Sequence, residues 1–526
     1  MAVNALLRSM RVLLVTGKAA SKIVEEYASK SGVDFEVYVM PYEVAALIPP
    51  HEIAKRLKAE GVKGFDCILT PGLISGDVSI IERELGIPTF KGPIHAADLP
   101  YVLPLLGKVE LSKTEAACRV LNLRRGAQDE EELKEIEDEL KGRSLFRIGD
   151  VDVAIGSLRI VAEITNAPSM SLDDVVAEAH RLRSCGADII DIGMIAGEER
   201  AEIAFKLVKA VKESLGRAVS IDTLNPSEIR AAVEAGADLV ISVDIGILDE
   251  LDDLPRDIAI VVIPTNIKKG YYPSTISEKV KCLEEVLSKV RGMGFKKVIA
   301  DPILSPPLQP SLLESLVAYY EFSKRHPDVP LMIGMGNVTE LMDVDSIGVN
   351  GLMAAIAAEL NAALILTTEA SNKTRGCVRE LYAAVKMAKL AKKRSKPMKD
   401  LSLSLLALKD KRDLTIPPSA IGGERPIKAE RSPSHKRDPA GYVKVTVDKK
   451  RKSIIVSHFK DGQHTLSIEG SRALEICDEL NRRGLITTLD HAAYIGRELC
   501  KAEIALKLGK SYVQDSDLDF VFMMSS

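Results

Sequence analysis

The sequence is poor in aromatic residues and contains no long apolar segment. Its 526 residues include no tryptophan, and Phe, Trp and Tyr together make up 4%. No apolar run approaches the ~20 residues of a membrane-spanning helix, and the N-terminal segment lacks a small-residue cleavage site. We therefore expect a cytoplasmic chain without a signal peptide. Lys and Arg number 71 against 75 Asp and Glu, a net charge of −4, which indicates neither nucleic acid nor a membrane as a partner.

Paired cysteines and side-chain amides are also scarce. The seven cysteines stand singly, without a CxxC pair or a Cys/His cluster, which argues against disulfides, iron–sulfur clusters and structural zinc. The chain has only ten Asn and four Gln, whereas Lys, Arg and Glu are plentiful. That bias is typical of proteins from thermophiles.

At about 150 residues per domain, the length of the chain predicts three or four domains. The first segment alternates strand-like and helical stretches. Within residues 1–145, strand-like runs at 11–17, 35–41, 65–71 and 87–92 are separated by amphipathic stretches. We predict a doubly wound α/β domain. Its glycine-containing loops match neither a Walker nor a dinucleotide fingerprint. The acidic run 129–139 is expected to form a solvated helix.

Residues 152–392 show a regular β/α alternation. Strand-like runs begin near 158, 188, 218, 238, 258, 297, 330 and 363, and a helical stretch follows almost every one. The runs are nearly continuous in apolar residues, as expected of parallel strands buried on both faces. Eight β/α units over about 240 residues predict a (β/α)8 TIM barrel.

The remaining chain divides into a basic linker and a small domain. Residues 393–440 are rich in Lys, Arg, Pro and Ser, and the basic run 386–399 suits the C-terminus of a helix. For 441–526 we predict an α+β unit with a hairpin and two helices. Asp490 is the expected N-cap of the last helix, with His491, Tyr494 and Glu498 on one face. His491 either packs within this domain or contacts a ligand or partner.

Polar side chains end all eight strands of the predicted barrel, at the edge where barrel enzymes place their active sites. Asp and Asn also favour loops and caps, but their recurrence at every strand indicates a binding site. Without His or Cys, the set excludes a metal centre of two histidines and a carboxylate, and leaves an oxygen-ligated Mg²⁺ site open. Carboxylates and amides suit a flat heterocycle with adjacent N–H donors, such as a 2-amino-4-oxopyrimidine edge. The residues are Asn166, Asp191, Asp222, Asp244, Asn266, Asp301, Asn337 and Glu369 with Asn372.

Several of these residues lie in segments that resemble one family. EITNAPSM (163–170) resembles the first-strand motif NVTPDSF of dihydropteroate synthases. GADIIDIG (186–193), VSIDT (219–223), EAGADLVISV (234–243) and ADPIL (300–304) resemble later landmarks of that family in the same order. The three-part layout is similar to archaeal dihydropteroate-synthase-related proteins. The resemblance implies a pterin-binding enzyme of folate or tetrahydromethanopterin metabolism that condenses a pterin with an arylamine, and family barrels commonly pair as homodimers.

The resemblance also implies roles for individual residues. Asp301 would hold the 2-amino and N3 edge of the pterin, and Asp222 would lie beside the opposite side of the ring. Asn166 stands where synthases hold Mg²⁺ and the diphosphate, and Asp191 would be a strand-end partner. The further substrate-binding candidates are Asp244, Asn266, Asn337 and Lys373.

The chain departs from the synthase pattern where positive charge is expected. The Ser-Arg-Lys after the seventh strand is replaced by 334–337 (GMGN), and Thr367 and Glu369 align with the Arg-x-His that holds the leaving diphosphate. A carboxylate repels a diphosphate, although Lys373 and Arg375 follow closely in sequence. The Asn that the family carries at its fourth strand is also absent from this chain, and Ser242 or Asp244 stands near its position.

The loop GMGNVTEL (334–341) resembles that of methyltetrahydrofolate:corrinoid methyltransferases, in which an Asn hydrogen-bonds near pterin N5. Asn337 and Asp222 are therefore the candidate catalytic residues, because methyl transfer requires stabilisation of protonated N5. Such an enzyme needs a corrinoid partner and no diphosphate clamp. A non-catalytic pterin carrier or scaffold is the third alternative.

Overall fold

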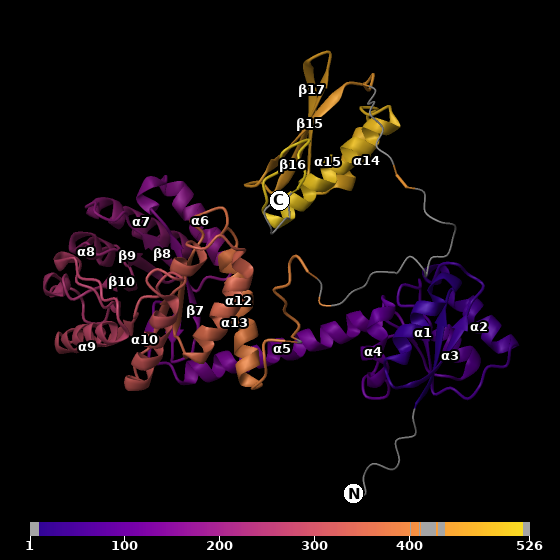
Figure 1. Ribbon diagram of the computed structural model, residues 1–526, viewed down its shortest axis with the longest axis horizontal. Helices are drawn as coiled ribbons and strands as arrows, with labels where there is room; N and C mark the ends of the chain where they lie inside the picture. The colour runs from indigo at the N-terminus through magenta and orange to yellow at the C-terminus, as the bar shows by residue number, and fades with distance from the viewer. Residues whose placement is uncertain (1–9, 400, 410, 412–427, 430–436, 519–526) are drawn as a thin grey trace, which may run out of the picture. The chain divides into compact units, whose positions relative to one another are not determined.

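The computed structural model describes residues 10–399, 401–409, 411, 428–429 and 437–518, except for the side chains of 123–125. The chain divides into two compact units, 1–422 and 423–526, each described by itself (Figure 1). Much of the predicted linker 393–440 lies outside the described residues. Among those described, no helix is both long and apolar enough to cross a membrane.

The first domain is the expected doubly wound α/β fold. Its four parallel strands lie in the order β2–β1–β3–β4. Leu13 and Val15 of β1 pack into one core with α2 and α3, and Val12 and Leu14 pack into another with α1 and α4. Successive strand residues thus cover opposite faces of the sheet. The elements are β1 (Arg11–Thr16), α1 (Ser21–Ser29), β2 (Asp34–Val39), α2 (Pro50–Ala59), β3 (Cys67–Thr70), α3 (Ser79–Leu85), β4 (Thr89–Lys91) and α4 (Leu99–Val102).

The acidic run lies in the long helix α5 (Ala117–Gly142) and packs against α13 (Cys377–Lys393). Glu137 accepts hydrogen bonds from Lys389 and Arg159, both at 2.6 Å. Asp129 is 1% exposed and pairs with Arg394. The prediction of a solvated acidic helix is therefore wrong for this face, because its partner is the basic run at the end of α13, far away in sequence.

Eight parallel strands form the predicted TIM barrel. They are hydrogen-bonded in the order β12–β11–β10–β9–β8–β7–β14–β13, and a parallel bridge between Ala300 and Leu331 joins the two edge strands. Figure 1 shows helices arranged around these strands. The strands are β7 (Arg159–Ile164), β8 (Ile189–Gly193), β9 (Val219–Asp222), β10 (Leu239–Val243), β11 (Ala259–Val262), β12 (Lys297–Ala300), β13 (Met332–Gly334) and β14 (Leu364–Thr368). The helices are α6 (Leu172–Ser184), α7 (Ala201–Leu215), α8 (Pro226–Glu234), α9 (Ile276–Gly292), α10 (Leu312–Arg325), α11 (Gly336–Thr339), α12 (Ser346–Glu359) and α13.

The barrel interior changes from apolar to acidic along the strands. A hairpin of β5 (Phe146–Ile148) and β6 (Val151–Val153) packs Ile148 and Val153 against interior residues such as Val161 and Ile189. Two residues further along the same strands, the inward positions are occupied by Glu163 and Asp191. Side chains two apart on a strand share a face, so these carboxylates continue the interior stack towards the active-site end of the barrel.

The second unit contains a three-stranded antiparallel sheet in the order β15–β16–β17 and two helices. The predicted hairpin is present, and a third, largely exposed strand extends it. The N-cap of the last helix is Thr488, whose hydroxyl accepts a hydrogen bond from the backbone N–H of His491, instead of the expected Asp490. The elements are β15 (Tyr442–Asp448), β16 (Ser453–Lys460), β17 (Gln463–Gly470), α14 (Ala473–Arg482) and α15 (Leu489–Leu508).

Candidate functional site

A cavity of about 240 Å³ opens at the carboxyl ends of the barrel strands. Acidic, amide, hydroxyl and apolar side chains surround it, and none of the described residues that line it is basic. An anionic ligand would therefore meet unfavourable charge, whereas a ligand rich in N–H donors would meet acceptors. The lining residues are Glu163, Asp222, Ile241, Ser242, Ile263, Asp301, Ile303, Leu304, Met332, Gly334, Gly336, Asn337, Leu366, Thr367 and Thr368.

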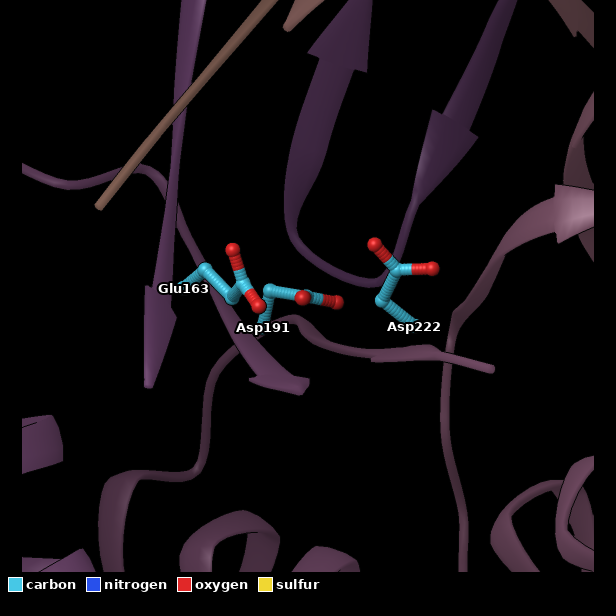
Figure 2. A group of neighbouring side chains, drawn as sticks. All are labelled: Glu163, Asp191 and Asp222. Atoms are coloured by element: carbon cyan, nitrogen blue, oxygen red, sulfur yellow. The ribbon is translucent and has the colours of Figure 1, made fainter. Parts of the chain in front are cut away.

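Three carboxylates lie close together at this cavity, and two of them, Glu163 and Asp222, line it. One oxygen from each of Glu163, Asp191 and Asp222, here called the carboxylate triad, lies within 4.8 Å of the others (Figure 2). Glu163 and Asp191 are directly paired in the register of β7 and β8, and Asp222 pairs with Gly193. A Cβ atom at 193 would collide with Oε1 of Glu163. Glycine at this position therefore leaves the room in which the triad assembles.

The triad receives little compensation for its charge. Oδ1 of Asp191 accepts a 2.6 Å hydrogen bond from Ser220, and the buried Oδ2 has no hydrogen-bond partner among the described residues. Burial raises the pKa of Glu163 to about 8, and the nearby Asp222 adds to the effect. Burial also raises the pKa of Asp222, and that of Asp191 well above its usual range. Close like charges disfavour full ionisation, so the triad retains protons at neutral pH.

Asp301 follows β12 and presents one oxygen to the cavity. Its Oδ1 accepts hydrogen bonds from the hydroxyl of the fully buried Tyr319 and from the backbone N–H of Ile303. Its Oδ2 is directed towards Gly334, 3.8 Å from where a Cβ would lie. Burial raises the pKa of Asp301 to about 6, while the bond from Tyr319 opposes this. The carboxyl is therefore largely ionised at neutral pH.

The backbone around Asp301 is held in an unusual conformation. Ile303 has φ = 63° and Ser242 has φ = 68°, and both line the cavity. A β-branched residue rarely adopts positive φ, and such strain concentrates at functional sites. Lys279 supports this loop, because its Nζ donates to the carbonyl of Ile303 at 2.9 Å and to the hydroxyl of Ser305 at 3.1 Å.

Asn337 lies at the start of α11 and lines the cavity beside the loop that follows Asp301. Its Nδ2 donates a 2.8 Å hydrogen bond to the carbonyl of Leu304. This bond fixes the amide and leaves Oδ1 as an acceptor. The structure thus brings together four of the residues identified from the sequence, namely Asp191, Asp222, Asp301 and Asn337.

Two other candidates make hydrogen bonds within the loops. Both oxygens of the buried Asp244 are occupied, Oδ1 by the backbone N–H groups of Gly246 and Ile247, and Oδ2 by the hydroxyl of Thr265 and the backbone N–H of Ile267. Asn266 caps a short turn through a bond from the backbone of Lys269. Neither residue lines the cavity.

The remaining candidates also lie outside the cavity lining. Asn166 is exposed, with φ = 51°. Lys373 pairs with Asp343 at 2.9 Å, and Arg375 is exposed. Glu369 is 3% exposed and pairs with Arg181 at 2.8 Å, so its carboxylate is already neutralised.

Three residues of the site, Glu163, Tyr319 and Lys279, were not identified from the sequence. Glu163 had a visible signature, because it is a lone acid within the apolar strand segment RIVAEI. Tyr319 and Lys279 lie on the inner faces of α10 and α9, where tyrosines and lysines commonly pack for structural reasons. Only the fold brings them to Asp301.

Three family models match separate parts of the chain. A model described as pterin binding enzyme matches residues 164–379, a model named PterinBD-DUF4346 matches 437–515, and a family of unknown function matches 10–94. An uncharacterized protein of Methanocaldococcus jannaschii is 40% identical over 97% of this chain and 99% of its own length. A dihydropteroate synthase of Clostridium beijerinckii is 27% identical over 31% of this chain and 65% of its own length. Among solved structures, a Yersinia pestis dihydropteroate synthase with a pterine–sulfa conjugate has 19% identity and a TM-score of 0.39, covering 47% of this chain and 99% of its own.

Proposed function

Because the chain belongs to the pterin-binding family related to dihydropteroate synthases, we propose that its barrel binds a reduced pterin and transfers a one-carbon group from it. The observation that carries this proposal is the cavity lined by Asp301, Asn337 and Asp222, with no basic side chain among the described residues that line it. Such a cavity offers acceptors to the N–H groups of a pterin and disfavours an anionic ligand. We place the activity in folate or tetrahydromethanopterin metabolism.

Asp301 recognises the pyrimidine edge of the pterin through one oxygen. Oδ1 already accepts two hydrogen bonds, from Tyr319 and Ile303, and a carboxylate oxygen has two lone pairs. Oδ2, which keeps both of its lone pairs, is therefore the oxygen that accepts from the 2-amino group and N3–H. Asn337 offers its side-chain oxygen to the same cavity.

The charge of the cavity favours methyl transfer over the synthase reaction. The synthase condensation expels a diphosphate, whose negative charge calls for cationic side chains. The described lining contains none, Glu369 is paired with Arg181, and Lys373 is paired with Asp343. When a methyl group is transferred from N5, the pterin departs as a neutral amine and no anion is expelled. This cavity therefore suits that reaction better.

In the methyl-transfer reaction, N5 of the methylated pterin takes up a proton from solvent. A reduced corrinoid on a partner protein would act as the methyl acceptor and would supply the electron pair of the new bond to the methyl carbon. The pair of the broken C–N5 bond stays on nitrogen, so the pterin leaves as a neutral N5–H amine. Asp222 stabilises the positive charge on protonated N5, and Asn337 accepts its hydrogen bond.

A fluorescence titration tests pterin binding. The full-length chain has no tryptophan, so pterin emission stands against a low protein background. We expect saturable binding of a reduced pterin that is weakened at least tenfold in Asp301→Asn. Asp343→Asn, whose carboxylate is 99% exposed, is the matched control. Absence of binding, or equal affinity in both variants, would contradict the proposal.

Turnover assays then separate the three alternatives. Methyl transfer predicts loss of a methyl-pterin signal with a reduced corrinoid as acceptor, slowed in Asn337→Ala with little change in pterin affinity. The synthase reaction predicts condensation of a pterin diphosphate with an arylamine, impaired in Lys373→Ala. A carrier would bind pterin and turn over neither substrate pair.

A further inference from the structure

The carboxylate triad differs from the half-buried Glu137 and the buried Glu369 in lacking a cationic partner. Glu137 has Lys389 and Arg159, and Glu369 has Arg181. The triad has only hydroxyl groups, that of Ser220 on Asp191 and that of Ser242 on Asp222. No basic side chain of the described chain forms an ion pair with its members. Without a cation, three acids placed together must either hold protons or be neutralised by a ligand.

An orphaned oxygen gives a second and independent indication. Asp191 is fully buried, and its Oδ2 has no hydrogen-bond partner among the described residues. Figure 2 shows the Asp191 carboxylate lying between Glu163 and Asp222. Buried polar atoms without partners are rare in folded proteins, and each one calls for an explanation. A ligand at the centre of the triad would supply the missing partner.

We propose that Glu163, Asp191 and Asp222 bind one divalent cation of the Mg²⁺ or Mn²⁺ class. Each residue contributes one oxygen from a group whose atoms lie within 4.8 Å of one another. Hard divalent cations take oxygen ligands, and Mg²⁺ keeps several water molecules when only a few carboxylates bind it. Glu163 and Asp222 line the cavity, so the open coordination positions face the space in which a small ligand would bind.

This site differs from the metal position implied by the family resemblance. Asn166 would supply that position, but it is exposed and lies outside both the triad and the cavity lining. The proposed cation instead sits at the end of the interior stack, where Gly193 leaves room for the Glu163 carboxylate. The inference does not depend on methyl transfer, because Asp222 gives one oxygen to the cation and keeps the other for the pterin, and a carrier could hold the cation equally.

Manganese binding to the pterin-free, full-length protein tests the site. After EDTA treatment and buffer exchange, free Mn²⁺ is followed by its electron paramagnetic resonance signal as protein is added. We expect one saturable site per chain, from which Mg²⁺ displaces Mn²⁺. Asp191→Asn should weaken binding by about tenfold or more, while the exposed control Asp343→Asn should bind as the wild type does. Absence of stoichiometric binding at millimolar Mn²⁺ would overturn the proposal.

A second variant guards against a folding defect in Asp191→Asn. Gly193→Ala adds a Cβ whose three nearest atoms all belong to the Glu163 side chain and not to backbone, so the fold can be retained while the carboxylate is displaced. We expect it to weaken Mn²⁺ binding with an unchanged circular dichroism spectrum. Wild-type Mn²⁺ affinity in both folded variants would refute the site. The pterin titration with Asp301→Asn tests a residue outside the carboxylate triad. Failure of one proposal is therefore distinguishable from failure of the other.

Discussion

The hydroxyl of Tyr319 donates a hydrogen bond to Oδ1 of Asp301, and both groups are buried between α10 and the end of β12. The backbone N–H of Ile303 donates to the same oxygen at 2.8 Å. Two donors on one oxygen leave the other oxygen for a ligand. They also stabilise the ionised carboxylate, which burial alone would disfavour.

Tyr319→Phe should therefore weaken pterin binding in a pH-dependent way. Loss of this bond removes a contribution that lowers the pKa of Asp301, which now lies at about 6. Hydrogen bonds to charged groups are worth ~1.5–3 kcal/mol, so the pKa should rise by one unit or more. We expect weaker binding at pH 7 and recovery near pH 8.5. Tyr320→Phe, at a neighbouring position that is 52% exposed, serves as the control, and a pH-independent loss would point to altered packing instead.

Glu163→Gln should flatten the pH dependence of stability in metal-free protein. The folded pKa of Glu163, about 8, lies above its unfolded value of about 4.3. The folded state therefore binds the proton more tightly, and stability falls as pH rises between these two values. Thermal unfolding from pH 5 to 9 in EDTA should show this decline in the wild type and a smaller one in Glu163→Gln. Glu202→Gln, 91% exposed, should decline as the wild type does, and parallel curves for all three proteins would contradict the assignment.

The barrel and the acidic half of its site were predictable from the sequence. Apolar runs at regular spacing, each followed by a polar residue, are produced by buried parallel strands whose carboxyl ends share one edge. Asp191, Asp222 and Asp301 were identified in this way and lie at that edge. The same rule also selected Asp244, which has the same position on its strand but uses both oxygens in loop hydrogen bonds. Strand position alone does not distinguish a ligand contact from a loop support.

The residues missed by the sequence analysis act across long separations. Tyr319 and Lys279 reach the Asp301 loop from helices whose inner faces show the same pattern as any packed helix. The acidic run on α5 and the basic run on α13 are about 260 residues apart, as in the pair Lys393–Glu135. Each looks solvated when considered alone, and only the tertiary fold pairs them. Local patterns determine elements, whereas such pairings depend on how the elements pack.

Lys389→Met should test how strongly α5 is held against α13. The side chain of Lys389 is 8% exposed and binds Glu137, which keeps Arg159 as a second partner. Because Glu137 stays paired, we expect a loss of roughly 1–3 kcal/mol in the free energy of unfolding. The exposed pair Lys141–Asp138 provides the comparison, since Lys141→Met should cost less than about 0.5 kcal/mol. Equal effects in denaturant titrations would show that the α5 contact contributes no more than a surface pair.

Asp438 should determine the acid stability of the C-terminal unit. Burial would raise its pKa, but hydrogen bonds from Thr487, Ala440 and His491 lower it well below the usual range. A depressed folded pKa means that the stabilisation is present above the unfolded value of ~3.9 and is lost as pH falls below it. Asp438→Asn should weaken this unit even at pH 7, by at least ~2 kcal/mol, seen as faster amide hydrogen exchange in α15 of the full chain. The exposed Asp490→Asn on the same helix should leave exchange unchanged, and similar rates in both variants would assign no anchoring role to Asp438.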